Sequence, residues 1–511
     1  MIPRRTLLGA ALTAVLLALA PGATAVAAGP SPLPAPGPTT IQADRQLDVG
    51  PDAQSVHVVW SFYGGSPDLP LPVHQTFVID ARGLAGVARV AVVDPRCTAD
   101  GQVFTCVNKD LSQLSNLDFT VQADAGAAVG ATGTVTYTAS GGPGTRGTAR
   151  AKVIVGVPDL VVGKVPAVTH ARTGSRIDVP LRLRNIGNLA TDRRIAVTWA
   201  AAGGPVFDRK FSNCGYRTGD DPAGPTSVTC VFPASVAAGG TVGLSSPLTA
   251  TIGAHTLNAE IDYTVALLQP GVQPDGSTEP GTGPALTLVP VSGTGAGFES
   301  GATGRLAVSA DSSADLAATA TTKPVTDAGA DADADADGWT LNLTVTDHGP
   351  ASVYAIDSQE YVAEVDVVLP PHTVATDYEH SESEDSAYGP CFVWVDDTTT
   401  APFEAGHRHY VCAVPFGIGA GKDVEAVLSV KPDKSYDGAK GTATVRSGPA
   451  GIALHDPRTS NDSATFTFGA PADTGTERTV LVTGAAIGIA LLGSVVLVLR
   501  RRGRSRQNPS P

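Results

Sequence analysis

The chain has 511 residues and a formal net charge of −14 at pH 7. Residues 1–28 and 479–511 hold seven arginines and no acid, so the rest of the chain carries −21. This negative charge argues against nucleic acid and anionic membranes as ligands of the main body. The main body is rich in Gly, Pro, Ala, Thr and Val, a composition that favours strands and turns over long helices. Since roughly 450 residues are too many for one hydrophobic core, we expect an all-β protein of about three domains.

Residues 1–28 are predicted to be a signal peptide. Met1–Arg5 is short and basic, Leu7–Ala20 is apolar, and residues 23–27 provide small-residue cleavage sites. The two arginines also fit a twin-arginine export signal, although we expect the general secretory route. Residues 29–40 form a proline-rich spacer, a composition that favours an extended arm.

Three segments, 41–157, 158–293 and 313–469, repeat one plan. Each opens with a strand in which apolar and polar residues alternate, so that one face is buried and the other is exposed to solvent, as in a two-sheet sandwich. A second strand follows. The apolar residues of the first strand are Val56, Val58, Trp60 and Phe62; Ile177, Val179, Leu181 and Leu183; and Trp339, Leu341, Leu343 and Val345. Those of the second strand are Val90 and Val92; Ile195, Val197 and Trp199; and Val365, Val367 and Leu369.

In the second and third segments the first strand ends in a matching turn, Asn185-Ile186-Gly187 and Asp347-His348-Gly349. The Asn or Asp side chain can bond its own backbone there. The glycine can adopt positive φ. We therefore expect a tight reversal of the chain at both places.

The six cysteines fall two per segment. In an exported protein this distribution is most simply three local disulfides, although fifteen connectivities are possible. No Cys-x-x-Cys spacing is present, which disfavours a zinc or redox site. The expected pairs are Cys97 and Cys106, Cys214 and Cys230, and Cys391 and Cys412.

The second cysteine of the two later pairs lies in a similar frame, and the third segment closes with an Asn-Asp-Ser-Ala strand. The frames are Val228–Pro233 followed by Ala238–Gly240, and Tyr410–Pro415 followed by Ala420–Gly421; the closing stretch is 456–464. This order resembles the conserved repeat domains of bacterial, actinobacterial-type surface proteins, an immunoglobulin-like group related to the cell-adhesion-related domain found in bacteria. The resemblance covers 313–469 and 158–293, whereas 41–157 keeps only the strand pattern and the cysteines. It implies a seven- or eight-stranded β-sandwich per repeat and a stalk or binding role without catalysis.

Residues 294–312 are predicted to be a Gly/Ser-rich linker, with Ala285–Val291 as the last strand of the second sandwich. Beyond the linker, residues 331–338 alternate Asp and Ala and end in Gly, like the start of a calcium loop. Thr344 stands where such a loop has a bidentate Glu, so we favour a solvated acidic loop without a cofactor. The alternative is a calcium site formed by Asp331, Asp333, Asp335 and Asp337.

Three further patterns have a functional and a structural interpretation. His407 and His409, with acids of the 377–385 stretch, could form a surface metal site, but a wet strand face is the preferred interpretation. Gly142–Gly147 fits a dinucleotide pattern, but it separates two strands and is predicted to be a hairpin loop. Trp60, Trp199 and Trp339 continue apolar faces and are expected in cores, while Trp394 is left open. No hydrolase elbow, zinc-protease helix or Walker loop is present, so we expect no enzyme.

The C-terminal segment is predicted to anchor the protein. Residues 470–478 precede the apolar run 479–499, whose 21 uncharged residues would span about 31 Å as a helix, and 500–511 form a basic cytoplasmic tail. Pro471–Gly475 is similar to a cell-wall sorting signal of the Leu-Ala-x-Thr-Gly type. The similarity covers Ala472, Thr474 and Gly475, with Pro471 in place of Leu, and implies sortase cleavage after Thr474.

Together these features predict a non-enzymatic protein of the cell membrane, with an extracellular N-terminal body of three immunoglobulin-like sandwiches and one C-terminal transmembrane helix, or a covalent attachment to the cell wall. Its role would be structural or adhesive. Expected partners are the cell envelope or peptidoglycan, an extracellular protein or glycan, and the membrane. The alternative is a carbohydrate-binding or calcium-dependent ligand-binding module.

Overall fold

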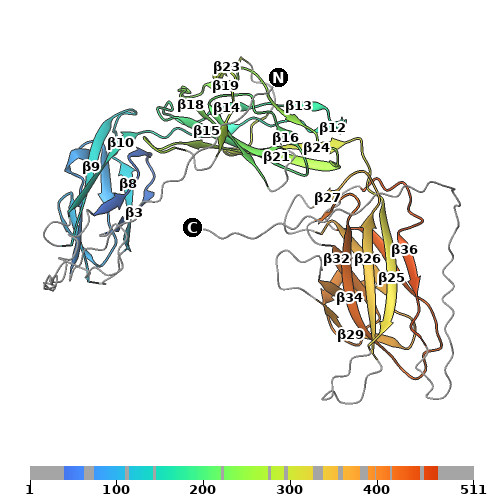
Figure 1. The fold of residues 1–511 in the computed structure, drawn as a ribbon. Coiled ribbons are helices and arrows are strands. Elements are labelled where there is room, and N and C mark those ends of the chain that lie inside the picture. Colours follow the sequence, from blue (N-terminus) through green and yellow to red (C-terminus); the bar gives the residue numbers. More distant parts are fainter. Residues whose placement is uncertain are drawn as a thin grey trace, which may run out of the picture.

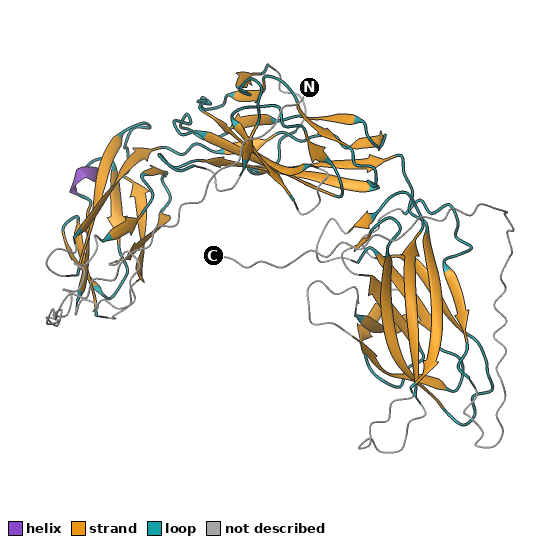
Figure 2. Ribbon diagram, viewed as in Figure 1, coloured by secondary structure: helices purple, strands orange, loops and turns teal. Residues whose placement is uncertain are grey.

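The computed structural model describes residues 39–469 except 62–73, 110–113, 142–145, 220–223, 274–277, 293–296, 326–337, 355–360, 380–389, 397–398, 415–416 and 449–453. Three β bodies follow one another in chain order (Figure 1). Apart from one short 3-10 helix, Arg82–Leu84, the elements of these residues are strands (Figure 2). No helix of this part of the chain is long and apolar enough to cross a bilayer. The predicted signal peptide, C-terminal motif, apolar segment and basic tail lie outside the described residues.

The first sandwich pairs a four-stranded sheet, β1-β3-β8-β5, with a six-stranded sheet, β2-β10-β9-β4-β7-β6. Short β2 runs parallel to β10, while the other pairings are antiparallel. The strands are β1 (Thr40–Gln42), β2 (Gln46–Val49), β3 (Gln54–Ser61), β4 (Gln75–Asp80), β5 (Ala88–Ala91), β6 (Cys97–Asp100), β7 (Val103–Asn108), β8 (Leu114–Ala123), β9 (Thr132–Ser140) and β10 (Gly147–Val155).

The second sandwich has a seven-stranded sheet, β12-β24-β21-β15-β18-β17-β22, opposite two smaller sheets, β11-β14-β19-β23 and β13-β20-β16. The strands are β11 (Leu160–Val162), β12 (Val168–Ala171), β13 (Arg176–Val179), β14 (Arg182–Asn185), β15 (Ile195–Ala202), β16 (Val206–Phe207), β17 (Cys214–Thr218), β18 (Pro225–Phe232), β19 (Thr241–Leu244), β20 (Leu248–Thr251), β21 (Asn258–Leu267), β22 (Glu279–Pro280), β23 (Leu288–Pro290) and β24 (Thr303–Ala310).

The third sandwich pairs β25-β26-β34-β29 with β31-β30-β32-β28-β35-β36, and β27 pairs with β33 beside them. The strands are β25 (Leu316–Pro324), β26 (Trp339–Asp347), β27 (Val353–Tyr354), β28 (Ala363–Val368), β29 (Thr373–Glu379), β30 (Cys391–Asp396), β31 (Thr399–Pro402), β32 (His409–Val414), β33 (Gly417–Ile418), β34 (Asp423–Pro432), β35 (Gly441–Ser447) and β36 (Ser463–Phe466).

All three sandwiches share one topology. With seven strands lettered A to G in chain order, one layer is A-B-E-D and the other contains G-F-C, the order of an immunoglobulin constant-type domain. In the second sandwich the A-B-E-D layer is divided between its two smaller sheets. Strands inserted between D and E extend the second layer beyond strand C and carry the cysteines; they are a hairpin in the first two sandwiches and the three strands β30, β31 and β32 in the third. The A to G strands are β1, β3, β4, β5, β8, β9 and β10; β11, β14, β15, β16, β19, β21 and β24; and β25, β26, β28, β29, β34, β35 and β36. The first segment, whose resemblance was the weakest, therefore has the same fold as the other two.

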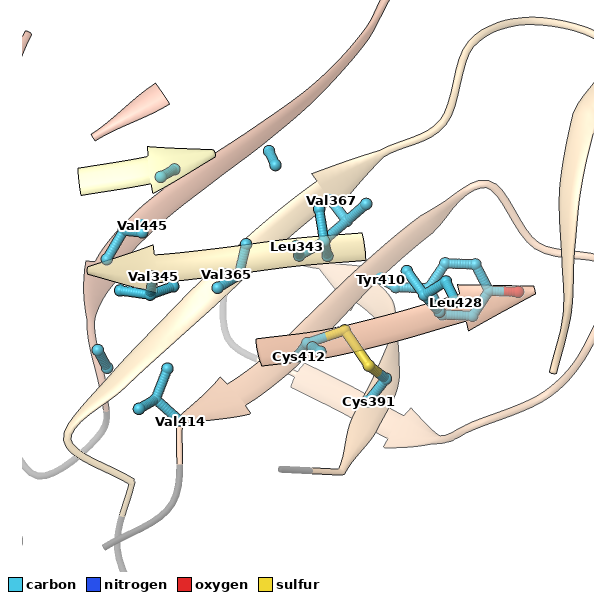
Figure 3. Packing of buried hydrophobic residues seen from close by; sticks show 14 of the residues in the cluster. Leu343, Val345, Val365, Val367, Cys391, Tyr410, Cys412, Val414, Leu428 and Val445 are labelled. Atoms are coloured by element: carbon cyan, nitrogen blue, oxygen red, sulfur yellow. A yellow bond between two sulfur atoms is a disulfide. The ribbon is translucent and has the colours of Figure 1, made fainter. Parts of the chain in front are cut away.

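Each sandwich encloses its own hydrophobic cluster. In the third, Leu343 and Val345 from β26 face Val365 and Val367 from β28, with the Cys391–Cys412 disulfide beside them (Figure 3). The alternation predicted for β3 and β26 is confirmed, since Val58 and Leu341 are fully buried and their neighbours are not. Phe62 lies outside the described residues.

Two strand predictions are wrong. The run from Ile177 to Leu183 is not one strand: β13 and β14 belong to different sheets because Pro180 between them cannot donate to a ladder. Val90 lies in β5 and Val92 follows it, so they do not match the second strands of the later segments. The matching strand is β4, whose Phe77 opposes Cys106 as Val197 opposes Cys230 and Val365 opposes Cys412.

The predicted linker 294–312 is also wrong. Within it, Thr303–Ala310 forms β24, the G strand of the second sandwich, which pairs with β21 over seven residues. Leu306 and Val308 are buried in the second cluster, so this strand closes the sandwich. The stretch 285–291 contributes β23, which precedes the true last strand.

Candidate functional site

The three disulfides are confirmed as local pairs. Cys97 is bonded to Cys106, Cys214 to Cys230 and Cys391 to Cys412, and no cysteine is free. In each case the two residues are direct cross-strand neighbours on two of the inserted strands. The bond therefore closes the inserted segment next to strand C. It contributes about 2 to 4 kcal/mol, in the chain-entropy account by restricting the unfolded chain.

A buried ion pair joins the first and second sandwiches. The guanidinium of Arg193 donates to the carboxylate of Asp48 on β2, and their side chains are only 13% and 4% exposed. Gln46 adds a side-chain bond of 2.7 Å to Asp192, and its backbone N–H and C=O bond the side-chain amide of Gln269 at 3.1 and 3.2 Å. Since unpairing one buried charge is costly, these contacts oppose bending at the junction.

The chain between these sandwiches is short and bonded as well. Strand β10 ends at Val155 and β11 begins at Leu160. Between them, the backbone N–H of Val157 donates to the side-chain oxygen of Asn188 at 2.8 Å. The connection therefore has little freedom to act as a hinge.

The second and third sandwiches also meet through specific contacts. The backbone N–H of Ser352 donates to the carbonyl of His255 at 2.8 Å, and the imidazole of His255 donates to the carbonyl of Pro350 at 2.8 Å. Leu257, which directly precedes β21 of the second sandwich, is 1% exposed and lies in the hydrophobic cluster of the third. The core of the third sandwich is thus completed by its neighbour.

One sheet face of the third sandwich gathers an aromatic ring and charged groups. The half-buried indole of Trp394 on β30 stacks with His409 at 4.8 Å between ring centroids, and the Arg446 guanidinium lies 4.6 Å from its centroid. His409 contacts Asp366 at 2.6 Å, and Arg446 donates to Glu364 at 3.1 Å. Each charged group therefore already has a partner within the face, and the ring is engaged by two cations or potential cations.

The possible histidine metal site is not assembled in the described residues. His407 lies 3.7 Å from Glu404, whereas His409 pairs with Asp366. No group of three or more His, Cys, Asp or Glu in this part of the chain is arranged to hold a metal ion. Residues 380–385 of the acidic stretch 377–385 lie outside the described residues, as do Asp331, Asp333, Asp335 and Asp337, and Ala472, Thr474 and Gly475.

A groove on the second sandwich shows what chemistry the described surface offers. It is lined by Arg194, Asn213, Gly215, Thr229 and Gln273, among others. Arg194 already donates to the carbonyl of Val272, and both polar ends of the Asn213 amide bond the backbone. Among its described lining residues there is no carboxylate or imidazole to act as a general base.

Sequence reasoning identified the cysteines and the buried Trp60 and Trp199, but not the junctions. Arg193 and Asp48 are 145 residues apart, so no local pattern connects them. The one available signal was Asp48 itself, a charge between Leu47 and Val49 in a fully buried strand.

Comparisons with known proteins do not assign a family. No protein-family model matches the chain, and no curated protein matches it. Solved structures that match include a Corynebacterium diphtheriae protein described as membrane anchored (10% identity, 85% of this chain and 91% of that chain, TM-score 0.17) and the titin I-band fragment I67–I69 (9%, 80% and 93%, 0.17). The C-terminal domain of the Streptococcus agalactiae AgI/II polypeptide BspA also matches (10%, 49% and 99%, 0.17). At these TM-scores the similarity carries no argument, and the fold rests on the strand order described above.

Proposed function

We propose that this chain is a non-enzymatic structural protein of the cell surface, in which three immunoglobulin-like sandwiches form a stiff spacer. The observation that carries the proposal is the bonding at both junctions. Arg193 and Asp48 pair at the first, and Leu257 enters the core of the third sandwich at the second. Flexible tethering would need neither contact, whereas a spacer that holds its outer end away from a surface needs both.

The display of this spacer outside the cell rests on the sequence. The signal peptide at 1–28 and the apolar segment 479–499 with its basic tail support an extracellular body and a single membrane crossing. The motif containing Ala472, Thr474 and Gly475 supports covalent attachment to peptidoglycan as the alternative anchor. The three cysteine pairs are in keeping with export, since disulfides persist in oxidising compartments.

An adhesive role, with a protein or glycan ligand, is the second candidate, and the Trp394 face is the surface that favours it. An indole on a sheet face can stack against a sugar ring. However, Arg446 and His409 already engage this indole, and their charges are matched by Glu364 and Asp366. A ligand would have to displace these contacts, so the spacer role has the stronger support.

The spacer proposal can be tested on intact cells that carry an epitope tag at the N-terminus of the mature protein. Residues 158–310 are replaced by a Gly/Ser segment of about 50 residues, whose root-mean-square length of about 40 Å is close to the width of a folded domain of the replaced size. Binding of antibody-coated beads is then compared with binding of a small Fab fragment. We expect the replacement to reduce bead binding while Fab binding is kept, because a flexible chain lets the tag sink toward the envelope. Equal bead binding by both proteins would refute a spacer role.

The adhesive alternative predicts a different result. If the native protein is retained on a glycan array or host matrix and Trp394→Ala abolishes retention, then the Trp394 face is a binding site. Mass spectrometry of the protein released from cell walls distinguishes the two possible anchors. A Thr474 terminus carrying a peptidoglycan fragment identifies sortase attachment, and an intact C-terminus identifies the membrane helix.

A further inference from the structure

The turn that follows strand B is built with the same backbone bonds in the second and third sandwiches. Asn185 ends β14 and Asp347 ends β26, and each sits at the same place in a network of three backbone bonds. The matched donors and acceptors are Asn185 N to Gly240 O and Asp347 N to Lys422 O, at 3.0 and 3.1 Å; Gly239 N to Asn185 O and Gly421 N to Asp347 O, both 2.8 Å; and Ile186 N to Asp159 O and His348 N to Asp315 O, both 2.7 Å. The two residues are therefore structurally equivalent.

One side-chain oxygen has the same role in both turns. Oδ1 of Asn185 accepts from the backbone N–H groups of Asp159 and Gly187, both at 3.0 Å. Oδ1 of Asp347 accepts from those of Asp315 at 3.1 Å and Gly349 at 2.8 Å. This atom ties the turn to the segment that enters each sandwich.

The second side-chain atom differs. Nδ2 of Asn185 donates to the carbonyls of Leu189 at 2.7 Å and Val236 at 3.0 Å. By the backbone match, the corresponding positions in the third sandwich are Ala351 and Ile418, both buried. The position that the donor Nδ2 occupies in the second sandwich is therefore taken by the carboxylate oxygen Oδ2 in the third.

That oxygen, Oδ2 of Asp347, is buried and has no hydrogen-bond partner among the described residues, and the residue is 0% exposed. A carboxylate that faces carbonyl oxygens is repelled by them, whereas a carboxylic acid can donate to one of them. Protonation of Oδ2 would therefore give Asp347 the donor that Asn185 has in Nδ2.

The surrounding charges favour the same form. Two other carboxylates lie near Asp347: Asp315 at the start of the third sandwich and Asp456 before its last strand. Asp315 accepts from Arg458 and Asn461, and Asp456 accepts from the backbone N–H groups of Leu316 and Arg458. No cationic side chain forms an ion pair with Asp347 in the described part of the chain. His348 and Lys422 reach the turn through their backbone groups.

The titration behaviour of these carboxyl groups is in line with the contacts. Burial raises the pKa of Asp347 above its ordinary 3.8, the two backbone donors lower it by less, and Asp315 and Asp456 raise it further. Burial also raises the pKa of nearby Asp462, next to Asp456 and Asp315. Burial alone would raise the pKa of Asp315, but the hydrogen bonds from Asn461 and Arg458 outweigh the effect of burial, so the pKa of Asp315 is lowered.

We propose that Asp347 is a structural carboxylic acid, whose Oδ2 carries a proton and donates it to a buried carbonyl in the way that Nδ2 of Asn185 does in the preceding sandwich. The third sandwich then contains a pH-responsive element that the second lacks. The proton is held in the folded state and released at lower pH in the unfolded one. The resulting stability is fully present below pH 3.8, the ordinary value for Asp, and is lost as the pH rises through the folded value.

The proton can be observed directly in the full chain, solubilised in a mild detergent. Difference infrared spectra between the native protein and Asp347→Asn, taken stepwise upward from pH 3.8, should show the carbonyl stretch of a protonated carboxylic acid that persists above this pH in the native protein and is lost in the variant. Absence of this band overturns the proposal.

Calorimetry from pH 4 to 9 gives the second readout. In the native protein the transition of the third sandwich should fall as the pH rises, and Asp347→Asn should remove this fall and raise the transition by roughly 4 °C or more at the alkaline end. The matched reverse variant, Asn185→Asp, should give the second sandwich the same pH dependence. A variant Asp347→Asn that is less stable than the native protein at every pH contradicts the proposal. So does a native transition that is lowered by EDTA and restored by calcium, because a cation then occupies the place of the proton.

Discussion

Arg193 of the second sandwich and Asp48 of the first form a salt bridge whose side chains are almost excluded from solvent, 13% and 4% exposed. Most other ion pairs in the described residues have at least one partner that is well exposed, as in Arg82 with Asp80 or Arg209 with Glu279. Desolvation offsets much of the attraction within a buried pair, whereas removal of one partner leaves an uncompensated buried charge and is costly. The position of this salt bridge between two domains indicates that it fixes their relative orientation.

Removal of Arg193 should therefore loosen the first junction. Arg193→Ala leaves the Asp48 charge buried without its partner, at a cost of about 3 to 5 kcal/mol, which the chain can relieve by separating the two sandwiches. Small-angle scattering of residues 29–475 should show a broader distribution of shapes. Arg82→Ala is the control: it breaks a pair in which Arg82 is 73% exposed, so it should leave both the stability and the shape nearly unchanged. Identical scattering from Arg193→Ala and the native protein would count against a fixed junction.

Leu257 should matter more to the third sandwich than to the second. Leu257→Ala removes a side chain that is 1% exposed inside the third hydrophobic cluster, which should cost about 2 to 5 kcal/mol. In calorimetry we expect the transition of the third sandwich to move down. Ile186→Ala, at a residue that is 54% exposed, should leave all transitions in place. If only the second sandwich loses stability, then Leu257 does not complete its neighbour's core.

The disulfides should differ in their contribution according to the length of chain they close. Their sequence separations are 9, 16 and 21 residues. In the chain-entropy account, the Cys391–Cys412 bond should stabilise its sandwich by roughly 0.8 kcal/mol more than the Cys97–Cys106 bond does. Urea unfolding of the paired Cys→Ala variants measures the two losses. A larger loss from the shortest loop would show that packing of the sulfur atoms, and not loop closure, determines the effect.

The alternation of residues in the sequence was enough to predict sandwiches, because burial of every second side chain is a local signal. It identified β3 and β26 from Val58 and Leu341. The same signal is present in β24, where Leu306, Val308 and Ala310 are buried, but the surrounding Gly and Ser residues led to a linker prediction. Pro180 likewise marked a break between β13 and β14 that the periodicity concealed.

The layer order and the junctions could not be obtained in this way. Pairing of β4 with β9, or of Arg193 with Asp48, depends on residues that are distant in sequence and meet only in the folded chain. The turn residues were predicted in part. Asn185 and Asp347 do bond the local backbone, but Gly187 and Gly349 do not adopt positive φ.

The reason for glycine at these two positions is close approach, and this leads to a final prediction. A Cβ at Gly187 would lie 2.1 Å from the carbonyl oxygen of Val157, and one at Gly349 would lie 2.7 Å from the Cα of Ala314. Both obstacles are backbone atoms of the segment that enters each sandwich. Gly187→Ala and Gly349→Ala should therefore push that segment away and expose it to proteases, with cleavage near 156–159 and 311–315 mapped by mass spectrometry.

Gly174→Ala separates this steric effect from backbone strain. Gly174 has φ of 75° and nothing within 4 Å of an added Cβ, so the substitution should cost about 1 to 2 kcal/mol without opening a junction. Protease resistance of Gly187→Ala and Gly349→Ala equal to that of Gly174→Ala would mean that the entering segments yield without detaching. Cleavage confined to the first two variants would show that the glycines are required because the incoming chain packs directly against the turn.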